Sequence, residues 1–211
     1  MTIQSLREAE AEGIDQLSLW DSDEIEISFT ESKKPINFDP LPDYPYQDQT
    51  IFCGSYQYES SPRFGSSETA SGTFQIRTES NFLATQTEND RPKPKKVINA
   101  ISDNINSGFS AKNEFVPNQE SVREFVGRAS RVANLKLYTA RGQVEQVEIR
   151  GDIDEIPAES AIKSAFLIFE FNGEEIEVDY QDGSLRINPS EDPYLEFILQ
   201  NFEMAFRSGE L

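Results

Sequence analysis

Carboxylates are the reactive side chains that this sequence places at suggestive spacings. In one expected strand acidic and apolar residues alternate, which puts Glu175, Glu177 and Asp179 on the same side. Like charges in such a row repel one another, so the row should stay in water or meet a basic partner. We therefore predict that these three residues form a partner-binding face.

Two further acidic triplets could offer oxygen ligands to a hard cation such as Mg²⁺ or Ca²⁺. They are Asp21, Asp23 and Glu24, and Asp152, Asp154 and Glu155. Neither has the spacing of a calcium-binding loop. The chain has 38 acidic and 19 basic residues, so short acidic triplets arise by chance and a solvated loop is favoured. We predict no metal and no cofactor, and keep a carboxylate- or metal-dependent enzyme as a third alternative.

Several common catalytic chemistries are excluded by residues that the chain lacks. It contains no histidine, which rules out Ser-His-Asp and Cys-His triads and histidine-containing zinc sites. It also has no glycine-rich phosphate-binding motif. Cys53 is the single cysteine, so no internal disulfide forms, and its apolar neighbour Phe52 indicates a buried structural thiol. These absences favour a non-catalytic role.

A basic centre gives the second functional hypothesis, which is a subunit associated with nucleic acid. Four basic residues precede an expected helix, and three arginines lie opposite the apolar stripe of the next one. They are Arg91, Lys93, Lys95 and Lys96, followed by Arg123, Arg128 and Arg131. Against this hypothesis, Glu120 and Glu124 share the outer face of the second helix, and the whole chain would repel phosphate.

The net charge of −19 is concentrated at the two ends of the chain. Residues 1–50 carry −9 and residues 151–211 carry −12, whereas 51–100 and 101–150 each carry +1. An acidic surface steers basic partners inward, although acidity also serves solubility or a salty cytoplasm. The leading hypothesis is an acidic interaction or regulatory protein that binds a basic protein surface. It could act as a subunit of a larger complex or as a nucleic-acid mimic.

No segment has the apolar length of a membrane span, since the longest uninterrupted run is Ala165–Phe169. Residues 1–12 lack the basic and apolar regions of a secretory signal. We therefore expect a cytoplasmic protein with no membrane contact.

The elements that must position these residues divide near residue 90, where the composition changes at Pro92 and Pro94. Region 1–90 is expected to be β-rich, with proline-rich and Ser/Gly-rich loops. Its predicted elements are a short helix over 2–12, strands over 24–29, 50–58, 73–77 and 81–87, and loops over 34–46 and 60–72.

Region 91–211 is expected to be α+β. Apolar spacing predicts central helices over 97–105 and 118–134, and strands over 135–140 and 144–149. A three-strand meander over 166–187 follows, with a tight turn at Asn172-Gly173 and a covering helix from Asp192 to Arg207. The predicted fold class is thus α+β, with antiparallel sheets, two central helices and a C-terminal helix packed on the meander. The sequence leaves open whether 1–90 and 91–211 share one core.

Overall fold

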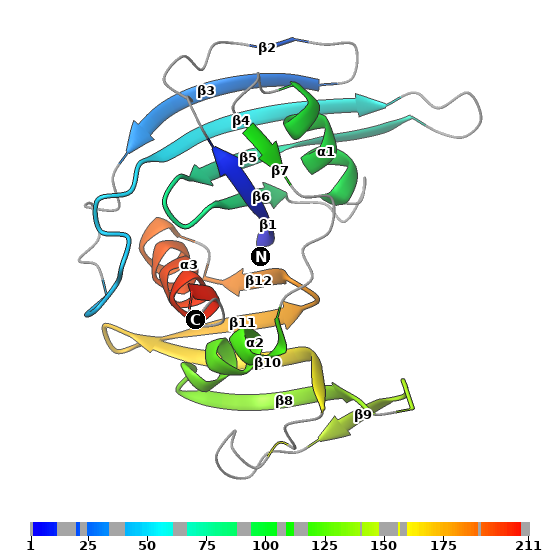
Figure 1. Ribbon diagram of the computed structural model, residues 1–211, viewed down its shortest axis with the longest axis vertical. Helices are drawn as coiled ribbons and strands as arrows, with labels where there is room; N and C mark the ends of the chain where they lie inside the picture. Colours follow the sequence, from blue (N-terminus) through cyan, green and yellow to red (C-terminus); the bar gives the residue numbers. More distant parts are fainter. Residues whose placement is uncertain are drawn as a thin grey trace. The chain divides into compact units, whose positions relative to one another are not determined.

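The computed structural model describes most of the chain as two compact units, which are coloured along the sequence in Figure 1. Unit 1 comprises Phe38–Pro45 and Val116–Leu211, with Met1, and unit 2 comprises Thr2–Asn37 and Tyr46–Phe115. The described residues are 2–11, 20–21, 25–33, 41–60, 67–87, 94–104, 109–111, 118–139, 141–147, 156, 160–189 and 191–207. The prediction of a mixed α+β fold with antiparallel sheets is confirmed.

Unit 2 combines an antiparallel sheet with one described helix, α1 (Pro94–Asn104). Within this unit the strands follow the order β2-β3-β4-β5-β6-β1, and β7 pairs with β1. The strands are β1 (Thr2–Ala11), β2 (Trp20–Asp21), β3 (Ile25–Lys33), β4 (Ile51–Ser60), β5 (Glu68–Arg77), β6 (Phe82–Thr87) and β7 (Phe109–Ala111). The predicted division near residue 90 falls inside this unit, between β6 and α1.

The core of unit 2 lies between its sheet and α1. Alternate residues of the strands, including Tyr56 and Phe74, pack with Val97, Ile98 and Ile101 of the helix. Gly72 in β5 has no room for a side chain, because an added Cβ would lie 2.0 Å from the Gln86 carbonyl oxygen. The close pairing of β5 with β6 therefore requires glycine at this position.

Two predictions for the N-terminal region are wrong. Residues 2–11 form strand β1 instead of a helix, with Ile3 opposite Thr87 of β6. Pairing with β6 satisfies the backbone groups of this segment, and its thin apolar stripe offered a helix little to bury. The predicted loop over 60–72 is also shorter, since β5 begins at Glu68. Residues 34–40 and 61–66 lie outside the described part of the chain.

Unit 1 has a sheet in the order β12-β11-β10-β8-β9, in which every pair is antiparallel. Its strands are β8 (Arg131–Tyr138), β9 (Val144–Val147), β10 (Ala161–Phe171), β11 (Glu174–Gln181) and β12 (Ser184–Asn188). Its helices are α2 (Gln119–Gly127) and α3 (Asp192–Arg207). Asn172-Gly173 and Asp182-Gly183 all have positive φ, as type I′ hairpin turns require, and they connect β10, β11 and β12.

Helix α2 is shorter than predicted. It begins after the N-cap Asn118, whose side chain accepts a hydrogen bond from the Glu120 N–H at 3.0 Å. It ends at Gly127, whereas the prediction extended it to residue 134. The chain turns there because Arg131 starts β8 opposite Ile168, and pairing with β10 outweighs the local helical spacing.

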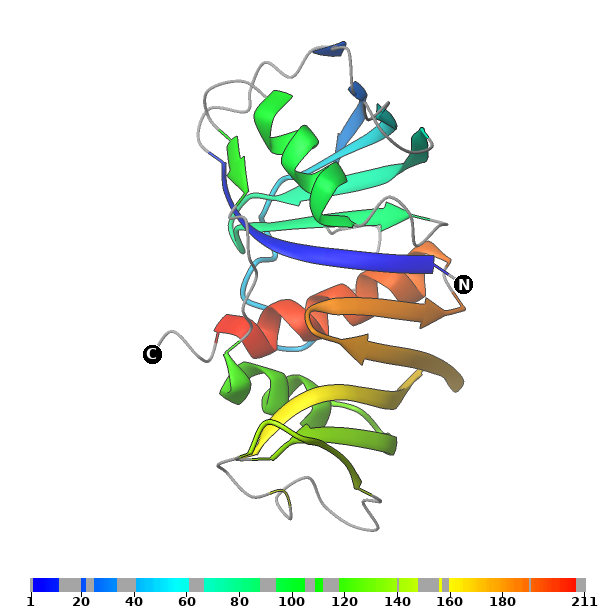
Figure 2. The same ribbon diagram turned by 90° about the vertical axis from the view of Figure 1, so that its right-hand side faces the viewer.

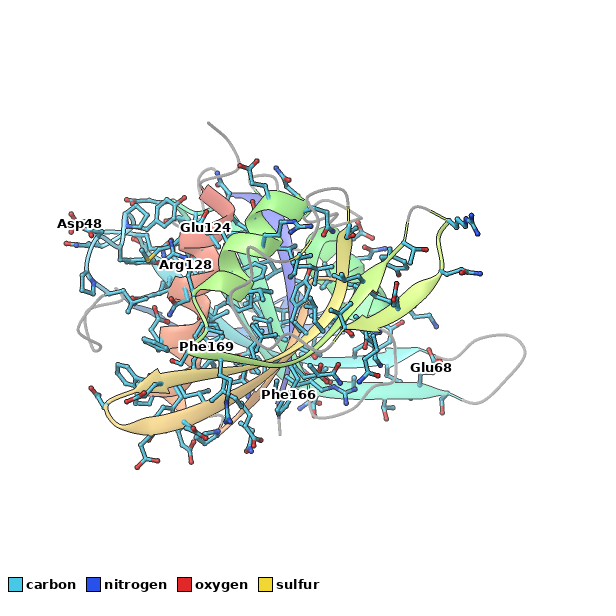
Figure 3. The ribbon with its side chains drawn as sticks, turned by 90° about the horizontal axis from the view of Figure 1, so that it is seen from below. Asp48, Glu68, Glu124, Arg128, Phe166 and Phe169 are labelled. Atoms are coloured by element: carbon cyan, nitrogen blue, oxygen red, sulfur yellow. The ribbon has the colours of Figure 1, made fainter. Side chains whose placement is uncertain are left out.

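Helices α2 and α3 cover one side of the unit 1 sheet, as the 90° view of Figure 2 and the view from below in Figure 3 show. The Phe125 side chain of α2 is fully buried between the helices and the sheet. Its ring centroid lies 5.2 Å from that of Phe202 in α3 and 5.5 Å from that of Phe169 in β10. Ile176 and Val178 of β11 face the same side and are fully buried. This side of the sheet is called the covered face below.

A short segment from the N-terminal half, residues 41–45, also belongs to unit 1 and is called the strap below. The Leu41 N–H donates to Gln200 Oε1 at 3.0 Å, and the Tyr44 hydroxyl donates to Glu203 Oε2. Gln200 and Glu203 are buried in α3, so these hydrogen bonds supply donors to polar groups that water does not reach. The strap therefore stabilises the C-terminal helix.

Candidate functional site

The other side of the unit 1 sheet carries a band of charged and polar side chains and is called the open face. No described helix of unit 1 lies on it; Figure 3 shows α2 and α3 on the side of Phe169. Register and alternation define its members. They are Arg131, Asn134 and Lys136 of β8, Ser164, Phe166, Ile168 and Glu170 of β10, Glu175, Glu177, Asp179 and Gln181 of β11, and Ser184, Arg186 and Asn188 of β12.

The predicted acidic row lies on this open face. Glu175 and Glu177 are exposed and Asp179 is half-buried, while the residues that alternate with them, Ile176, Val178 and Tyr180, have no exposed surface. The structure thus confirms which way each residue of the strand points. Partner binding by the row stays a prediction.

Basic residues flank the acidic row. An Arg131 guanidinium nitrogen lies 3.7 Å from a Glu175 carboxylate oxygen, and both side chains are more than 60% exposed (63% and 68%). Such an exposed, loose ion pair contributes at most about 1 kcal/mol. Arg186 lies opposite Asp179 in the β11–β12 register. The open face therefore combines both signs of charge, with acidic side chains crowded near the 172–173 turn.

Two adjoining hollows lie at the other end of the open face. The first, of about 330 Å³, is lined by Lys136, Val144, Gln146, Lys163, Ser164 and Gln181. The second, of about 310 Å³, shares Lys136 and Ser164 with the first and extends over Ala133, Asn134, Ala165, Phe166 and Asp179. Sequence reasoning missed Lys136 and Lys163. The fold brings them together because β8 and β10 pair, although they are 27 positions apart in the chain.

The first group of predicted basic residues is only partly described. Arg91 and Lys93 lie outside the described residues, and Lys95 is in α1 without a described side chain. Lys96 of α1 lies 2.5 Å from Glu68 of β5, and this hydrogen bond raises the pKa of Lys96. Its ammonium group is thus already paired within unit 2.

The second group of predicted basic residues does not form one exposed helical face, so that prediction is wrong. Arg123 is half-buried and donates to the Ile156 and Ser160 carbonyl oxygens at 3.2 and 2.5 Å. These bonds tie α2 to the segment before β10. Arg131 lies on β8 and not on a helix.

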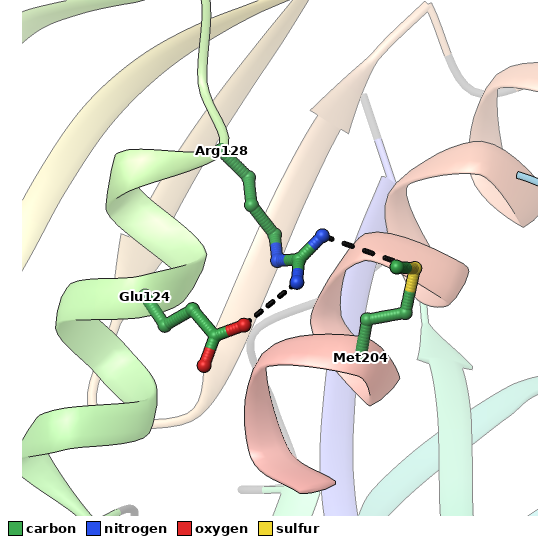
Figure 4. A network of polar contacts seen from close by, with 3 residues as sticks. All are labelled: Glu124, Arg128 and Met204. Carbon is green, nitrogen blue, oxygen red and sulfur yellow. Dashed lines mark hydrogen bonds and ion pairs between the residues drawn. The ribbon is translucent and has the colours of Figure 1, made fainter. Parts of the chain in front are cut away.

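Arg128 connects the end of α2 to α3, as the close view in Figure 4 shows. One guanidinium nitrogen lies 2.6 Å from Glu124 Oε1, and the other donates to the Met204 sulfur at 3.8 Å. The Arg128 side chain is 27% exposed. Arg123 and the two terminal guanidinium nitrogens of Arg128 therefore donate within unit 1.

The predicted acidic triplets fall where the structure gives no side-chain geometry. Asp23, Glu24 and the triplet 152–155 lie outside the described residues, and the Asp21 side chain in β2 is not described. Within the described part of the chain, no three cysteine or acidic side chains converge as a metal site would require.

Cys53 lies on β4 and is half-buried, more open than the predicted buried thiol.

No helix in the described ranges has both the length and the apolar character needed to cross a membrane.

The sequence matches no protein-family model. It also shows no significant similarity to a curated protein. The open face is therefore the candidate site on geometric grounds. It carries the acidic row and the hollow lined by Lys136 and Lys163, called the lysine-lined hollow below.

Proposed function

We propose that the chain is a non-catalytic interaction protein that binds a basic protein surface through Glu175, Glu177 and Asp179. The observation that carries this proposal is the alternation along β11. Ile176, Val178 and Tyr180 are fully buried, which fixes the three carboxylates in one row on the opposite side.

The geometry of the row supports a contact with an extended basic segment or a basic strand. Successive outward residues of a strand are about 6.6 Å apart, so three carboxylates span about 13 Å in a straight line. Glu170 lies beside Glu175 in the register and widens the acidic end. Because the strands are paired and packed on a buried core, the row costs little conformational entropy to hold in place.

The intramolecular partners of the row are weak enough for an external cation to compete. Arg131 meets Glu175 only at 3.7 Å in an exposed pair. Glu177 accepts a 3.1 Å hydrogen bond from the Asn188 amide, which is neutral. A lysine or arginine of a partner would bring a full charge to the same oxygens.

The test is a charge reversal of the row with a matched control. The row variant carries Glu175→Lys, Glu177→Lys and Asp179→Lys, and the control carries Glu59→Lys, Glu79→Lys and Asp103→Lys at exposed positions of unit 2. Both raise the net charge equally. Binding of a ten-residue lysine-rich peptide is measured by calorimetry at two salt concentrations.

We expect the row variant to bind the peptide about tenfold more weakly than the control, a difference of about 1.4 kcal/mol. Affinity of the unmodified chain should fall with added salt, because the contacts are between exposed charges. Equal losses in the two variants would mean that only net charge matters and would overturn the proposal. Preferential binding of a single-stranded oligonucleotide would instead favour the nucleic-acid alternative.

A further inference from the structure

The lysine-lined hollow of unit 1 carries a second inference, which does not depend on the acidic row. It is defined by two cations on neighbouring strands, Lys136 of β8 and Lys163 of β10. Gln146, Ser164 and Gln181 add hydrogen-bonding groups around them. Its volume of about 330 Å³ lies within the size range of small-molecule sites, near the lower end.

A β-bulge creates this arrangement. Ile162 pairs with Leu137, but Ser164 pairs with Lys136, so β10 has one extra residue at position 163. In a regular strand Lys163 and Ser164 would point to opposite faces, whereas here both line the same hollow. The bulge thus places a second lysine on the open face beside the first.

The charge of the hollow is uncompensated by the described residues. None of its described lining residues is acidic, and neither lysine makes an ion pair with a side chain that the structure describes. By contrast, Lys96, Arg128 and Arg131 each meet a glutamate. The Lys163 ammonium lies 5.3 Å from the centre of the Tyr138 ring, which holds a cation without neutralising it. In a chain with twice as many acids as bases, two adjacent cations without a described counter-charge are unexpected.

We propose that this hollow binds a single oxyanion, a carboxylate or a phosphate group, between Lys136 and Lys163. The ammonium groups supply the charge, and the Ser164 hydroxyl and the glutamine amides supply further donors. An anion there relieves the repulsion between two cations on adjacent strands.

The adjoining hollow indicates what the rest of the ligand looks like. It leads from Lys136 and Ser164 over the half-buried Phe166 ring toward Asp179. The aromatic surface suits an apolar body, while the Asp179 carboxylate disfavours a second negative group. The ligand is therefore a small organic anion with one charged end and an uncharged, partly apolar body.

Phenyl phosphate and benzoate are the probes, because they share a body and differ in the anionic group. Each is titrated into the protein of residues 1–211 at low ionic strength while amide resonances are followed by NMR. Benzyl alcohol is the uncharged control. We expect saturable shifts confined to residues 134–146, 163–166 and 179–181 for at least one of the anions, and none for the alcohol. The anion that binds more tightly identifies the group.

The variants are Lys136→Gln, Lys163→Gln and the double variant, with Lys96→Gln in unit 2 as the control. The double variant should bind the anion at least tenfold more weakly, and Lys96→Gln should bind it as the unmodified chain does. Resonances outside the open face report that each variant stays folded. Shifts spread over the whole protein, or shifts that persist in the double variant, overturn the proposal.

Two proposals concern the open face, peptide binding by the acidic row and anion binding in the lysine-lined hollow, and separate variants test them. Glu175→Gln and Glu177→Gln should leave anion binding intact, because neither residue lines the hollow. Loss of peptide binding in the double variant Glu175→Lys and Glu177→Lys, with unchanged anion binding, would support the row and the hollow as two sites.

Discussion

The covered and open faces of the unit 1 sheet are built from alternate residues of the same strands, but they differ in almost every property. On the covered face Phe169, Ile176 and Val178 are buried against helices. On the open face Glu175, Glu177 and Lys136 are exposed. A shift of one residue in the register would exchange the two sets. The hairpin turns that fix the register therefore also decide where any binding occurs.

This difference implies that stability and recognition can be changed independently in unit 1. Apolar contacts on the covered face account for packing, whereas exposed charges add little to folding. Substitutions on the covered face should therefore change mainly the free energy of unfolding, and substitutions on the open face should change mainly binding. The following predictions test that separation, beginning with the largest effect.

The largest effect is expected for Phe125→Ala on the covered face. The ring is fully buried among Phe169, Tyr180 and Phe202, so its removal should destabilise unit 1 by about 3–5 kcal/mol. The control is Phe166→Ala on the open face, where the half-buried ring should cost about 1 kcal/mol. Hydrogen exchange of β10 and β11 amides measures both. Similar losses in the two variants would contradict the division into faces.

A smaller effect is expected for Tyr44→Phe in the strap. The change removes the hydrogen bond to the buried Glu203 carboxylate, which should cost about 1–3 kcal/mol. Tyr194→Phe, at a half-buried position near the start of α3, should change stability by less than about 0.5 kcal/mol. Hydrogen exchange of α3 amides measures the difference. Equal effects of the two substitutions would mean that the strap does not stabilise the helix.

The third prediction concerns alkaline pH. Burial raises the pKa of the Tyr180 hydroxyl on the covered face above the ordinary value of 10.0. Above pH 10 the unfolded chain therefore loses this proton while the folded chain keeps it, so stability falls as pH rises. The slope should be shallower in Tyr180→Phe, by up to about 1.4 kcal/mol per pH unit. Denaturation of both proteins between pH 9 and 11 tests this, and identical slopes would contradict it.

Local sequence signals predicted the part of unit 1 that local interactions determine. Asn172-Gly173 specifies a tight turn, the alternation after it specifies the two faces of β11, and Asp192 starts α3 where expected. The acidic row follows directly from these signals. The direction in which each of its residues points could be predicted without knowledge of the rest of the chain.

Pairing between distant segments could not be predicted in the same way. β1 is a strand because β6 lies beside it, and Arg131 leaves the helical pattern because β10 pairs with β8. The lysine-lined hollow depends on such a pairing and on a bulge at position 163 of β10. The sequence signal of this bulge is Ile162-Lys163-Ser164-Ala165, where two polar residues separate the apolar positions 162 and 165 and break the strict alternation of a strand.

The strap has a consequence for the order in which the chain folds during synthesis. The hydrogen bonds of Leu41 and Tyr44 join residues that are 159 positions apart. A ribosome releases the N-terminal end first, so the strap must wait until α3 has been synthesised. Unit 1 therefore reaches its final packing only after residues 200 and 203 have emerged, and closing so long a loop slows that step.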